Sequence, residues 1–299
     1  MTAGQHLTRA VEYDDEFMLE ATERGCRTFI RTVVEDAGAN GVVVALSGGI
    51  DSTTAAMLAV DALGPASVSG LILPAGPTAD ANRRDAQIVA EALQITHRTV
   101  DLQPLLDQFT KQMTAPHWMQ DGDVRECESV VHGPRETRAS FTEALGNAAA
   151  RLRMVATYFE ANTANRLVLG TSNRTESLLG YVTKFGDGAA DLRPLGDLYK
   201  TEVRALARRL GVPRRIVEKA PTAGLLPDQT DEEDLGADYE TIDEILRAVV
   251  DQGRSRHTAA EAVGVDVELV DRFVEMYAAS AHKRRLPPTP GTYPEVTVR

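Results

Sequence analysis

The sequence predicts an α/β fold in which a doubly wound, mostly parallel β-sheet has helices on both faces and leads into a helical C-terminal region at about 238–285. Short apolar runs at 42–46, 67–73 and 166–170 alternate with longer amphipathic stretches. Polar turns follow the first and the last of these runs, which is typical of sheets that bind ligands beyond their strand ends. We expect the 299 residues to form a single domain, 1–299.

The first elements in chain order are a helix, a strand and a second helix. Residues 14–37 form an amphipathic stretch, and residues 51–63 predict the second helix. Between them, residues 42–46 are apolar and mostly β-branched, as expected of a strand buried on both faces of a parallel sheet. The apolar face expected on the first helix comprises Phe17, Met18, Ala21, Cys26, Phe29, Ile30 and Val33.

The same alternation continues in the next part of the chain. Residues 67–73 and 96–100 predict two more strands, with a helix over 79–93 between them. His97 and Arg98 interrupt the apolar pattern of the later strand. Because charged and polar side chains are poorly suited to the middle of a buried sheet, we expect this strand near an edge or a mouth.

Residues 113–138 fit the pattern poorly, because they are rich in Gly, Pro, His and charge and have little periodicity. We interpret this segment as a loop excursion on the surface, and a mobile lid near the substrate is the alternative. Lone histidines are more often surface or core residues than ligands. No function is therefore assigned to His117, Trp118 or His132.

The segment Ser47-Gly48-Gly49 joins the first strand to its helix and has the layout of a phosphate site. Glycines permit unusual backbone angles and let a ligand approach the main chain. The N–H groups and the positive dipole end of the following helix would then face an anion. The alternative is an ordinary strand-to-helix connection in which Asp51 or Ser52 serves as the N-cap.

Composition favours a soluble enzyme and disfavours several other classes of protein. The net charge of −12 disfavours a nucleic-acid surface over most of the protein. The sequence shows no long apolar run and no secretory signal, so we expect no membrane span and a cytoplasmic location. Cys26 and Cys127 lack Cys-x-x-Cys spacing, and we interpret both as free thiols rather than zinc ligands or a disulfide.

The hexapeptide at 47–52, Ser-Gly-Gly-Ile-Asp-Ser, resembles the pyrophosphate-binding loop of the N-type ATP pyrophosphatases. It differs from the loop of kinase-like NTPases and from the dinucleotide fingerprint. The resemblance implies a Rossmann-like sheet of the adenine nucleotide alpha hydrolase type, ATP as co-substrate, and AMP transfer with pyrophosphate as the leaving group. The ATP-binding residues that it implies here are Leu46, Ser47, Gly48, Gly49, Ile50, Asp51, Ser52 and Thr53.

A longer series of motifs resembles the ammonia-dependent NAD synthetases. In chain order these motifs lie at 146–154, 169–176, 180–191, 219–222 and 282–283. The resemblance implies ATP-dependent amidation of deamido-NAD to NAD through an acyl-adenylate, with release of AMP and pyrophosphate. It assigns catalysis to Asp51, Glu176 and Lys200, with Mg²⁺ on the two carboxylates. It adds Thr171, Lys200 and Thr222 to the ATP site, and it implies deamido-NAD contacts at Arg151, Lys184, Asp191, His282 and Lys283.

The same resemblance bears on assembly and on the nitrogen source. The family places its deamido-NAD site at a homodimer interface, so we expect a homodimer. No segment resembles the amidase domain of glutamine-dependent relatives. Nitrogen would then come from free ammonia or from a separate glutamine amidotransferase, which nothing in the sequence indicates. One departure from the family is Gly224 in place of an Asp, whereas the motif that ends at Glu176 keeps its acid.

Two alternatives of other classes remain at this point. One is a sibling enzyme that uses the same ATP loop on a different oxygen, such as a GMP synthetase or a tRNA-modifying core. The other is a non-catalytic regulatory module, because residues 257–277 suggest a helix-turn-helix. The second helix of that pattern carries Asp266, Glu268, Asp271 and Glu275 against a single Arg272, so ordinary helix packing is the better interpretation.

Overall fold

The computed structural model describes residues 16–75, 79–113, 135–221 and 230–290, and its strands form a four-stranded parallel sheet in the order β3-β2-β1-β4. The strands are β1 (Val42–Ala45), β2 (Val68–Ile72), β3 (Thr96–Thr99) and β4 (Leu167–Leu169). Val42 of β1 pairs with Val68 on one side and Leu167 on the other. Leu169, the last residue of β4, makes an isolated parallel bridge to Leu192. The predicted parallel sheet is confirmed, and β3 lies at its edge as His97 and Arg98 indicated.

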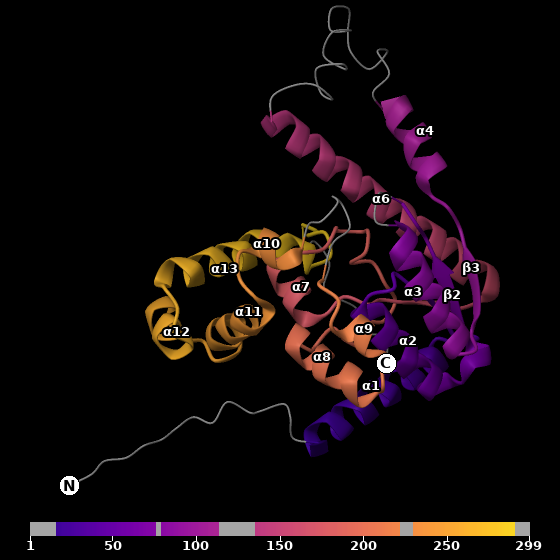
Figure 1. The fold of residues 1–299 in the computed structure, drawn as a ribbon, viewed down its shortest axis with the longest axis horizontal. Coiled ribbons are helices and arrows are strands. Elements are labelled where there is room, and N and C mark those ends of the chain that lie inside the picture. Colours follow the sequence, from indigo (N-terminus) through magenta and orange to yellow (C-terminus); the bar gives the residue numbers. More distant parts are fainter. Residues whose placement is uncertain (1–15, 76–78, 114–134, 222–229, 291–299) are drawn as a thin grey trace, which may run out of the picture.

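Helices cover both faces of this sheet (Figure 1). Val42 and Val44 of β1 belong to a cluster shared with α1 (Glu16–Asp36), α2 (Ile50–Leu63) and α3 (Ala79–Ala92). Val43, which points to the opposite face, packs with Ala161 of α6 (Arg135–Ala164). Successive residues of a strand point to opposite faces, so the uninterrupted apolar run of β1 follows from burial on both sides.

The boundaries predicted for α1, α2, α3 and the four strands agree with the observed ones to within two residues. The apolar face predicted for α1 is partly wrong. Cys26 and Ile30 are buried, but Phe17 and Phe29 are 69% and 43% exposed. The buried side chains of α1 include Leu19 and follow a narrower stripe, because the helix meets the body mainly along α2.

The structure corrects the end of the predicted loop excursion at 113–138, because residues 135–138 are helical. Met113 is the last residue of α4 (Gln103–Met113), and α6 begins at Arg135. Residues near the start of α6 have good helix propensity but no apolar period, so a search for periodicity passes over them. Residues 114–134, including His117, Trp118, Cys127 and His132, lie outside the described part of the chain.

The second half of the chain adds mostly short helices, which gather beside the sheet and are coloured orange to yellow in Figure 1. They are α7 (Arg174–Leu179), α8 (Lys200–Arg209), α9 (Arg214–Val217), α10 (Asp231–Leu235), α11 (Tyr239–Leu246), α12 (Arg256–Val263) and α13 (Val267–Ala279). Short 3-10 or π turns lie at Pro65–Ser67, Arg247–Asp251 and Ser280–Lys283. A separate apolar cluster, which contains Tyr239, Ile242 and Phe273, holds α11 to α13 together. The helical C-terminal region is therefore confirmed.

The suggested helix-turn-helix at 257–277 is a real helix pair, α12 and α13. Gly264 ends α12 in a left-handed conformation with φ of +79°. Val270 and Phe273 of α13 are fully buried in the apolar cluster. The pair therefore has the ordinary packing role that its acidic second helix favoured. Within the described ranges, no helix is long and apolar enough to cross a membrane.

Candidate active site

The turn between β1 and α2 has the geometry of an anion site. Gly48 has φ of +76°, and a Cβ there would lie 2.3 Å from the backbone oxygen of Asn82 on α3. Only glycine fits this position. Gly49 is the N-cap of α2 at an ordinary φ of −95°. Because Gly49 has no side chain, the cap residue leaves the first N–H groups of α2 open to a ligand.

The hydroxyl groups of the turn shape it from inside. Ser52 donates to the Gly49 oxygen at 3.2 Å, and Thr53 donates to the same oxygen at 2.8 Å. Ser47 Oγ lies 3.0 Å from Ser52 Oγ and accepts from the Gly49 N–H at 3.3 Å. Ser52 and Thr53 are buried, whereas Ser47 is exposed. Ser47 is thus the hydroxyl placed to meet a ligand, and the alternative with Asp51 or Ser52 as the N-cap is wrong.

Three charged side chains meet beside this turn. The Lys200 ammonium lies 2.5 Å from Asp51 Oδ2 and 3.3 Å from Glu176 Oε1. Asp51 belongs to the first turn of α2 after β1, Glu176 to α7 after β4, and Lys200 begins α8. The side chain of Lys200 is 3% exposed, against 18% for Asp51 and 17% for Glu176. The sequence named all three residues, and the structure brings them together.

Asn173 completes this group and was missed as a site residue. Its Nδ2 donates to Asp51 Oδ1 at 3.0 Å, and its Oδ1 accepts from the Glu176 N–H at 2.9 Å. The Asn173 N–H donates in turn to Glu176 Oε2 at 3.3 Å, which closes a capping box. Asn three residues before Glu is the sequence signal for that box. The contact with Asp51 joins residues 122 positions apart and has no sequence signal.

The electrostatics of the group are set by partial burial and by mutual charge. Burial raises the pKa of Glu176 to about 7, with the Lys200 ammonium opposing the shift and the Asp51 carboxylate adding to it. Burial alone would lower the pKa of Lys200, but the carboxylates of Asp51 and Glu176 outweigh it and raise that pKa. Lys200 therefore stays charged at neutral pH, and the site holds a fixed cation beside acidic oxygens.

The other residues predicted for the ATP site differ in burial, and one of them lies outside the described residues. Leu46 and Ile50 are buried in apolar clusters, so only their backbones can face a ligand. Thr171 follows β4 and is half-buried. Thr222, like Gly224, lies outside the described residues.

Most residues predicted to bind the dinucleotide form a second group of contacts. Lys184 Nζ donates to the His282 oxygen at 2.7 Å, and Arg151 donates to the Lys184 oxygen at 3.1 Å. Lys283 Nζ donates to the Gly180 and Val182 oxygens at 2.7 and 2.9 Å. The structure thus brings α6, the 183–188 turn and the chain after α13 together.

Asp191 lies apart from that group. Its Oδ2 accepts from the Val168 N–H of β4 at 2.7 Å, and its Oδ1 accepts from the Tyr158 hydroxyl at 3.3 Å. Phe185 was missed by the sequence interpretation. It is 51% exposed at φ of +59°, with its ring centroid 5.2 Å from Lys184 Nζ. A non-glycine residue at positive φ points to a constrained turn.

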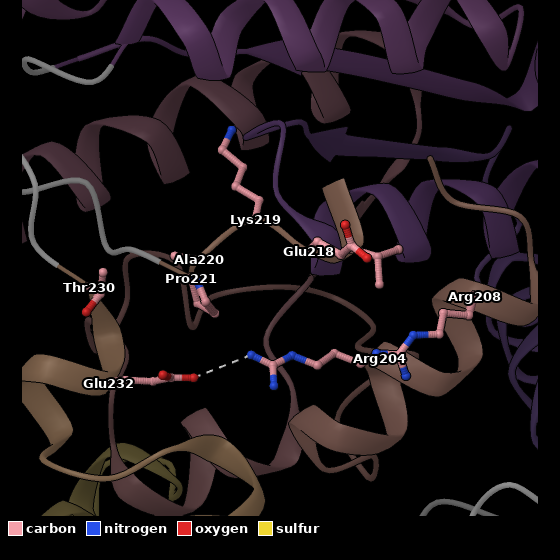
Figure 2. A pocket seen from close by; sticks show the side chains of 9 residues that line it. Arg204, Arg208, Glu218, Lys219, Ala220, Pro221, Thr230 and Glu232 are labelled. Atoms are coloured by element: carbon pink, nitrogen blue, oxygen red, sulfur yellow. Dashed lines mark ion pairs between the residues drawn. The ribbon is translucent and has the colours of Figure 1, made fainter. Parts of the chain in front are cut away.

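A pocket of about 380 Å³ lies between α8, α9 and the segment before α10 (Figure 2). Arg204 lies 3.6 Å from Glu232 across it. Figure 2 shows the Lys219 side chain pointing away from this pair. Lys219 Nζ donates to Asn82 Oδ1 at 2.6 Å and Asp85 Oδ2 at 2.9 Å on α3, the helix that packs on Gly48. Lys219 therefore supports α3 where this helix packs against the Gly48 turn.

We call Lys200, Asp51, Glu176 and Asn173 the first group. The carboxylates of this group are its possible ligands for a metal ion. Across the described residues, no cluster of three or more His, Cys, Asp or Glu side chains is arranged to bind a metal. Asp51 and Glu176 offer two carboxylates, and both contact the same ammonium. Such a pair is too small to form a complete protein metal site, and further ligands would have to come from a bound substrate or water.

Comparison with known proteins identifies the family of this chain. A model of the family "NAD synthase" matches residues 23–287. The chain is 44% identical over 273 residues to the NH(3)-dependent NAD(+) synthetase of Halobacterium salinarum, covering 91% of this chain and 94% of the relative. Among solved structures, NMN synthetase from Francisella tularensis superposes with a TM-score of 0.74 at 34% identity over 91% of this chain and 98% of that one. NH3-dependent NAD synthetase from Campylobacter jejuni does so with a TM-score of 0.68 at 29% identity over 91% and 98% of the two chains. The chain belongs to the NAD synthase family.

Proposed function

We propose that this protein is an ammonia-dependent NAD synthetase that amidates deamido-NAD at the expense of ATP. The observation that carries the proposal is the contact of Lys200 with Asp51 and Glu176 beside the open N-terminus of α2. Asp51 and Glu176 follow the ends of two different strands of a parallel sheet, which is where such sheets bind nucleotides. The family and its ammonia-dependent members agree with that chemistry.

The residues of the first group would bind and orient the ATP phosphates. The N–H groups at the start of α2 and the Ser47 hydroxyl donate to phosphate oxygens, and the Lys200 ammonium neutralises part of their charge. Asn173 holds Asp51 so that it faces Lys200. The site therefore presents a pre-arranged set of donors to a polyphosphate, which lowers the reorganisation needed for reaction.

Asp51 and Glu176 are the residues that would hold Mg²⁺. Both carboxylates reach one cation, the Lys200 ammonium, so they converge on a single point. Mg²⁺ prefers one or two carboxylates together with phosphate oxygens and water, which fits this donor set. When bound, Mg²⁺ would neutralise charge on the phosphate groups.

The reaction proceeds in two balanced steps. The nicotinate carboxylate of deamido-NAD attacks the α-phosphorus of ATP, which forms an acyl-phosphate bond and breaks the bond to pyrophosphate. Ammonia then attacks the acyl carbon, forms the amide, expels AMP and releases a proton. The attacking carboxylate is already ionised at neutral pH, so the first step needs no general base and no covalent enzyme nucleophile. The role of the chain is to position and neutralise charge.

The second group would bind the dinucleotide. Within the described ranges, neither Lys184 nor Lys283 pairs with a carboxylate, and both ammoniums bind backbone oxygens instead. Their charge is therefore available to an anionic substrate. Ser172 donates to the Asp187 oxygen at 3.4 Å, which joins the turn after β4 to the turn that carries Lys184. This contact supports one continuous site across the two groups.

The homodimer expected from the family has a candidate surface. Exposed apolar side chains on α4 and α6 include Phe109, Met113, Val155 and Phe159, with 44%, 48%, 57% and 65% exposure. A groove of about 450 Å³ between these helices is bordered by Arg151 of the second group. A second copy of the chain on this surface would place the dinucleotide site at the interface.

Light scattering tests the dimer. We expect Val155→Asp to shift the mass toward a monomer and to weaken deamido-NAD binding, because a charge in an apolar interface is unfavourable. Phe17→Asp on α1, which also replaces an exposed apolar side chain, is the matched control and should stay dimeric. A monomeric parent protein would contradict the proposal.

Product analysis tests the function itself. Incubation with ATP, Mg²⁺, ammonium and deamido-NAD should give NAD, AMP and pyrophosphate in equal amounts. Replacing ammonium by glutamine should stop the reaction, and activity with glutamine would point to an amidotransferase. AMP and pyrophosphate formed only with another acceptor would keep the ATP chemistry and overturn the substrate.

The structural likeness to an NMN synthetase makes the mononucleotide the substrate to test against deamido-NAD. We expect kcat/KM to favour deamido-NAD by about tenfold or more, since its AMP half, which the mononucleotide lacks, adds binding contacts. A preference for nicotinate mononucleotide would reassign the enzyme to NMN synthesis.

Two further expectations from the sequence stay predictions. The chain should unfold as a single domain in one cooperative transition, which calorimetry would measure. The protein should be found in the cytoplasm, which cell fractionation would test.

A further inference from the structure

Helix α11 presents two fully buried polar side chains to the helices of the charged group. Tyr239 and Asp243 are both 0% exposed and stand four residues apart, on one face of the helix. Their neighbours on α11, Ile242, Ile245 and Leu246, belong to the apolar cluster of the C-terminal region. A carboxylate in such surroundings is unfavourable unless it makes specific hydrogen bonds. Burial accordingly raises the pKa of Asp243.

Asp243 binds the beginnings of two helices. Its Oδ1 accepts from the Thr175 hydroxyl of α7 at 2.5 Å, and its Oδ2 accepts from the Thr201 N–H of α8 at 2.9 Å. The Thr175 oxygen also accepts from the Lys200 N–H at 3.0 Å. Thr175 precedes Glu176 and Thr201 follows Lys200, so one carboxylate fixes the backbone beside both charged residues.

Tyr239 lies directly against the ammonium. Its ring centroid is 5.3 Å from Lys200 Nζ and 5.6 Å from the Arg204 guanidinium carbon. Its hydroxyl donates to Asp231 Oδ2 at 2.9 Å, which fixes the tilt of the ring. A cation over an aromatic face is stabilised most when it is shielded from water, and the Lys200 side chain is only 3% exposed.

We propose that Tyr239 and Asp243 are positioning residues for the ATP-dependent step. Asp243 holds α7 and α8 in the register that lets Glu176 and Asp51 reach one ammonium, and the Tyr239 ring holds that ammonium in place. This inference rests on the proposed function for its substrate. The arrangement also gives the separate helical region a role, because α11 supports a site that lies at the ends of β1 and β4.

A matched pair of variants separates positioning from packing. Tyr239→Leu and Phe273→Leu each remove a fully buried ring from the same apolar cluster, but only Tyr239 contacts Lys200. We expect Tyr239→Leu to lower kcat/KM for ATP about tenfold more than Phe273→Leu does, with KM for deamido-NAD within about twofold of the parent. Tyr239→Phe keeps the ring and should retain most of the activity. Equal losses in the two leucine variants at equal loss of stability would overturn the role of Tyr239.

The role of Asp243 is tested by removing its charge and, separately, by altering its hydrogen-bond partner Thr175. Asp243→Asn should lower kcat/KM for ATP about tenfold or more, because an amide cannot accept both hydrogen bonds on its two ends. Asp271→Asn on α13, which removes an exposed partner of Arg256, is the control. If Asp243→Asn does not fold, Thr175→Val and Thr175→Ser replace it, since only serine keeps the hydroxyl. Parent-like turnover in Asp243→Asn, or in Thr175→Val, would overturn the role of Asp243.

Calorimetric titration with ATP and Mg²⁺, in the absence of deamido-NAD, measures ATP binding alone. It therefore tests the roles of these residues without assuming which acceptor the enzyme uses. If the parent protein binds ATP but does not convert deamido-NAD, the proposed function fails while the inference can still be tested. We then expect Tyr239→Leu to bind ATP several-fold more weakly than Phe273→Leu. Equal ATP affinities in these two variants would overturn the inference whatever the acceptor is.

Discussion

The two groups of charged residues in this protein are built on different rules. In the first group, the Lys200 ammonium faces the carboxylates of Asp51 and Glu176, and its side chain is 3% exposed. In the second group, the ammoniums of Lys184 and Lys283 bind backbone oxygens near the surface. In the first group, the charge of the ammonium is balanced by carboxylates. In the second group, the ammoniums are held by uncharged carbonyl oxygens.

This difference indicates how each group meets an anion. Carboxylates around Lys200 keep it protonated and in place, but they also cancel its charge, so in our proposal a metal ion would have to supply further positive charge for the phosphates. Carbonyl oxygens orient Lys184 and Lys283 without cancelling their charge. We therefore expect the first group to govern ATP chemistry and the second to govern affinity for the dinucleotide.

The largest expected effect is the loss of the shared cation. Lys200→Met should lower kcat/KM for ATP by about a thousandfold, because one contact to the developing phosphate charge is lost and two carboxylates are left facing each other. Breaking this partly buried arrangement should also lower the free energy of unfolding by about 1–3 kcal/mol. Steady-state kinetics and denaturant unfolding measure the two effects. Arg24→Met on α1, which also removes a cation but one that is 64% exposed and far from both groups in the sequence, is the control and should change neither quantity appreciably.

The next effect separates charge from fold within the first group. Asp51→Asn should lower turnover about a hundredfold at saturating Mg²⁺, because the amide is a poorer metal ligand and a weaker partner of Lys200. Its shape is preserved, so circular dichroism should match that of the parent protein. Normal turnover in this variant would end the metal assignment.

A smaller and more selective effect is expected in the second group. Lys184→Met should raise KM for deamido-NAD about tenfold through loss of one charge-assisted contact, and leave ATP affinity unchanged. Titrations with each substrate alone would test this split. Equal weakening of both substrates would mean that the two groups do not act separately.

The smallest effect is on stability and depends on pH. The pKa of Glu176 is raised from 4.5 in the unfolded chain to about 7 in the folded protein, so the folded state disfavours the ionised carboxylate. This penalty is absent at pH 4, grows as the pH rises through about 4.5 to 7, and is complete at pH 8. Without Mg²⁺ and ATP, Glu176→Gln should therefore be more stable than the parent by about 1–2 kcal/mol at pH 8 and no more stable at pH 4. It should also be inactive, and a lower melting temperature at pH 8 would contradict the predicted direction.

Much of the first group could be predicted from the sequence, because its parts are local. The apolar run of β1, the turn through Gly48 and the helix that carries Asp51 are consecutive in the chain. Glu176 and Lys200 were assigned by resemblance to a family, and the structure then placed both against Asp51. Periodicity and turn chemistry depend on residues that are close in the sequence. Here the strand, the turn and the start of the helix are consecutive, and together they form this part of the site.

The contacts that hold the site residues in place could not be predicted in the same way. Asn173 contacts Asp51 across 122 positions, and Lys184 contacts the His282 oxygen across 98. Tyr239 and Asp243 lie in an amphipathic helix. The helical pattern indicates which face is buried but does not identify the residues that these two side chains contact. The start of α6 was missed because helix propensity without an apolar period gives no clear pattern.

The sequence by itself determined the four strands, the helices α1 to α3, and the glycine required at Gly48. Those features follow from backbone sterics and from periodicity over a few residues, and both act within a short stretch of chain. Only the tertiary structure decided that Lys200 is shared by two carboxylates and held by α11, and that Lys184 and Lys283 bind carbonyl oxygens. Such contacts join distant segments, and they depend on how buried faces pack against one another.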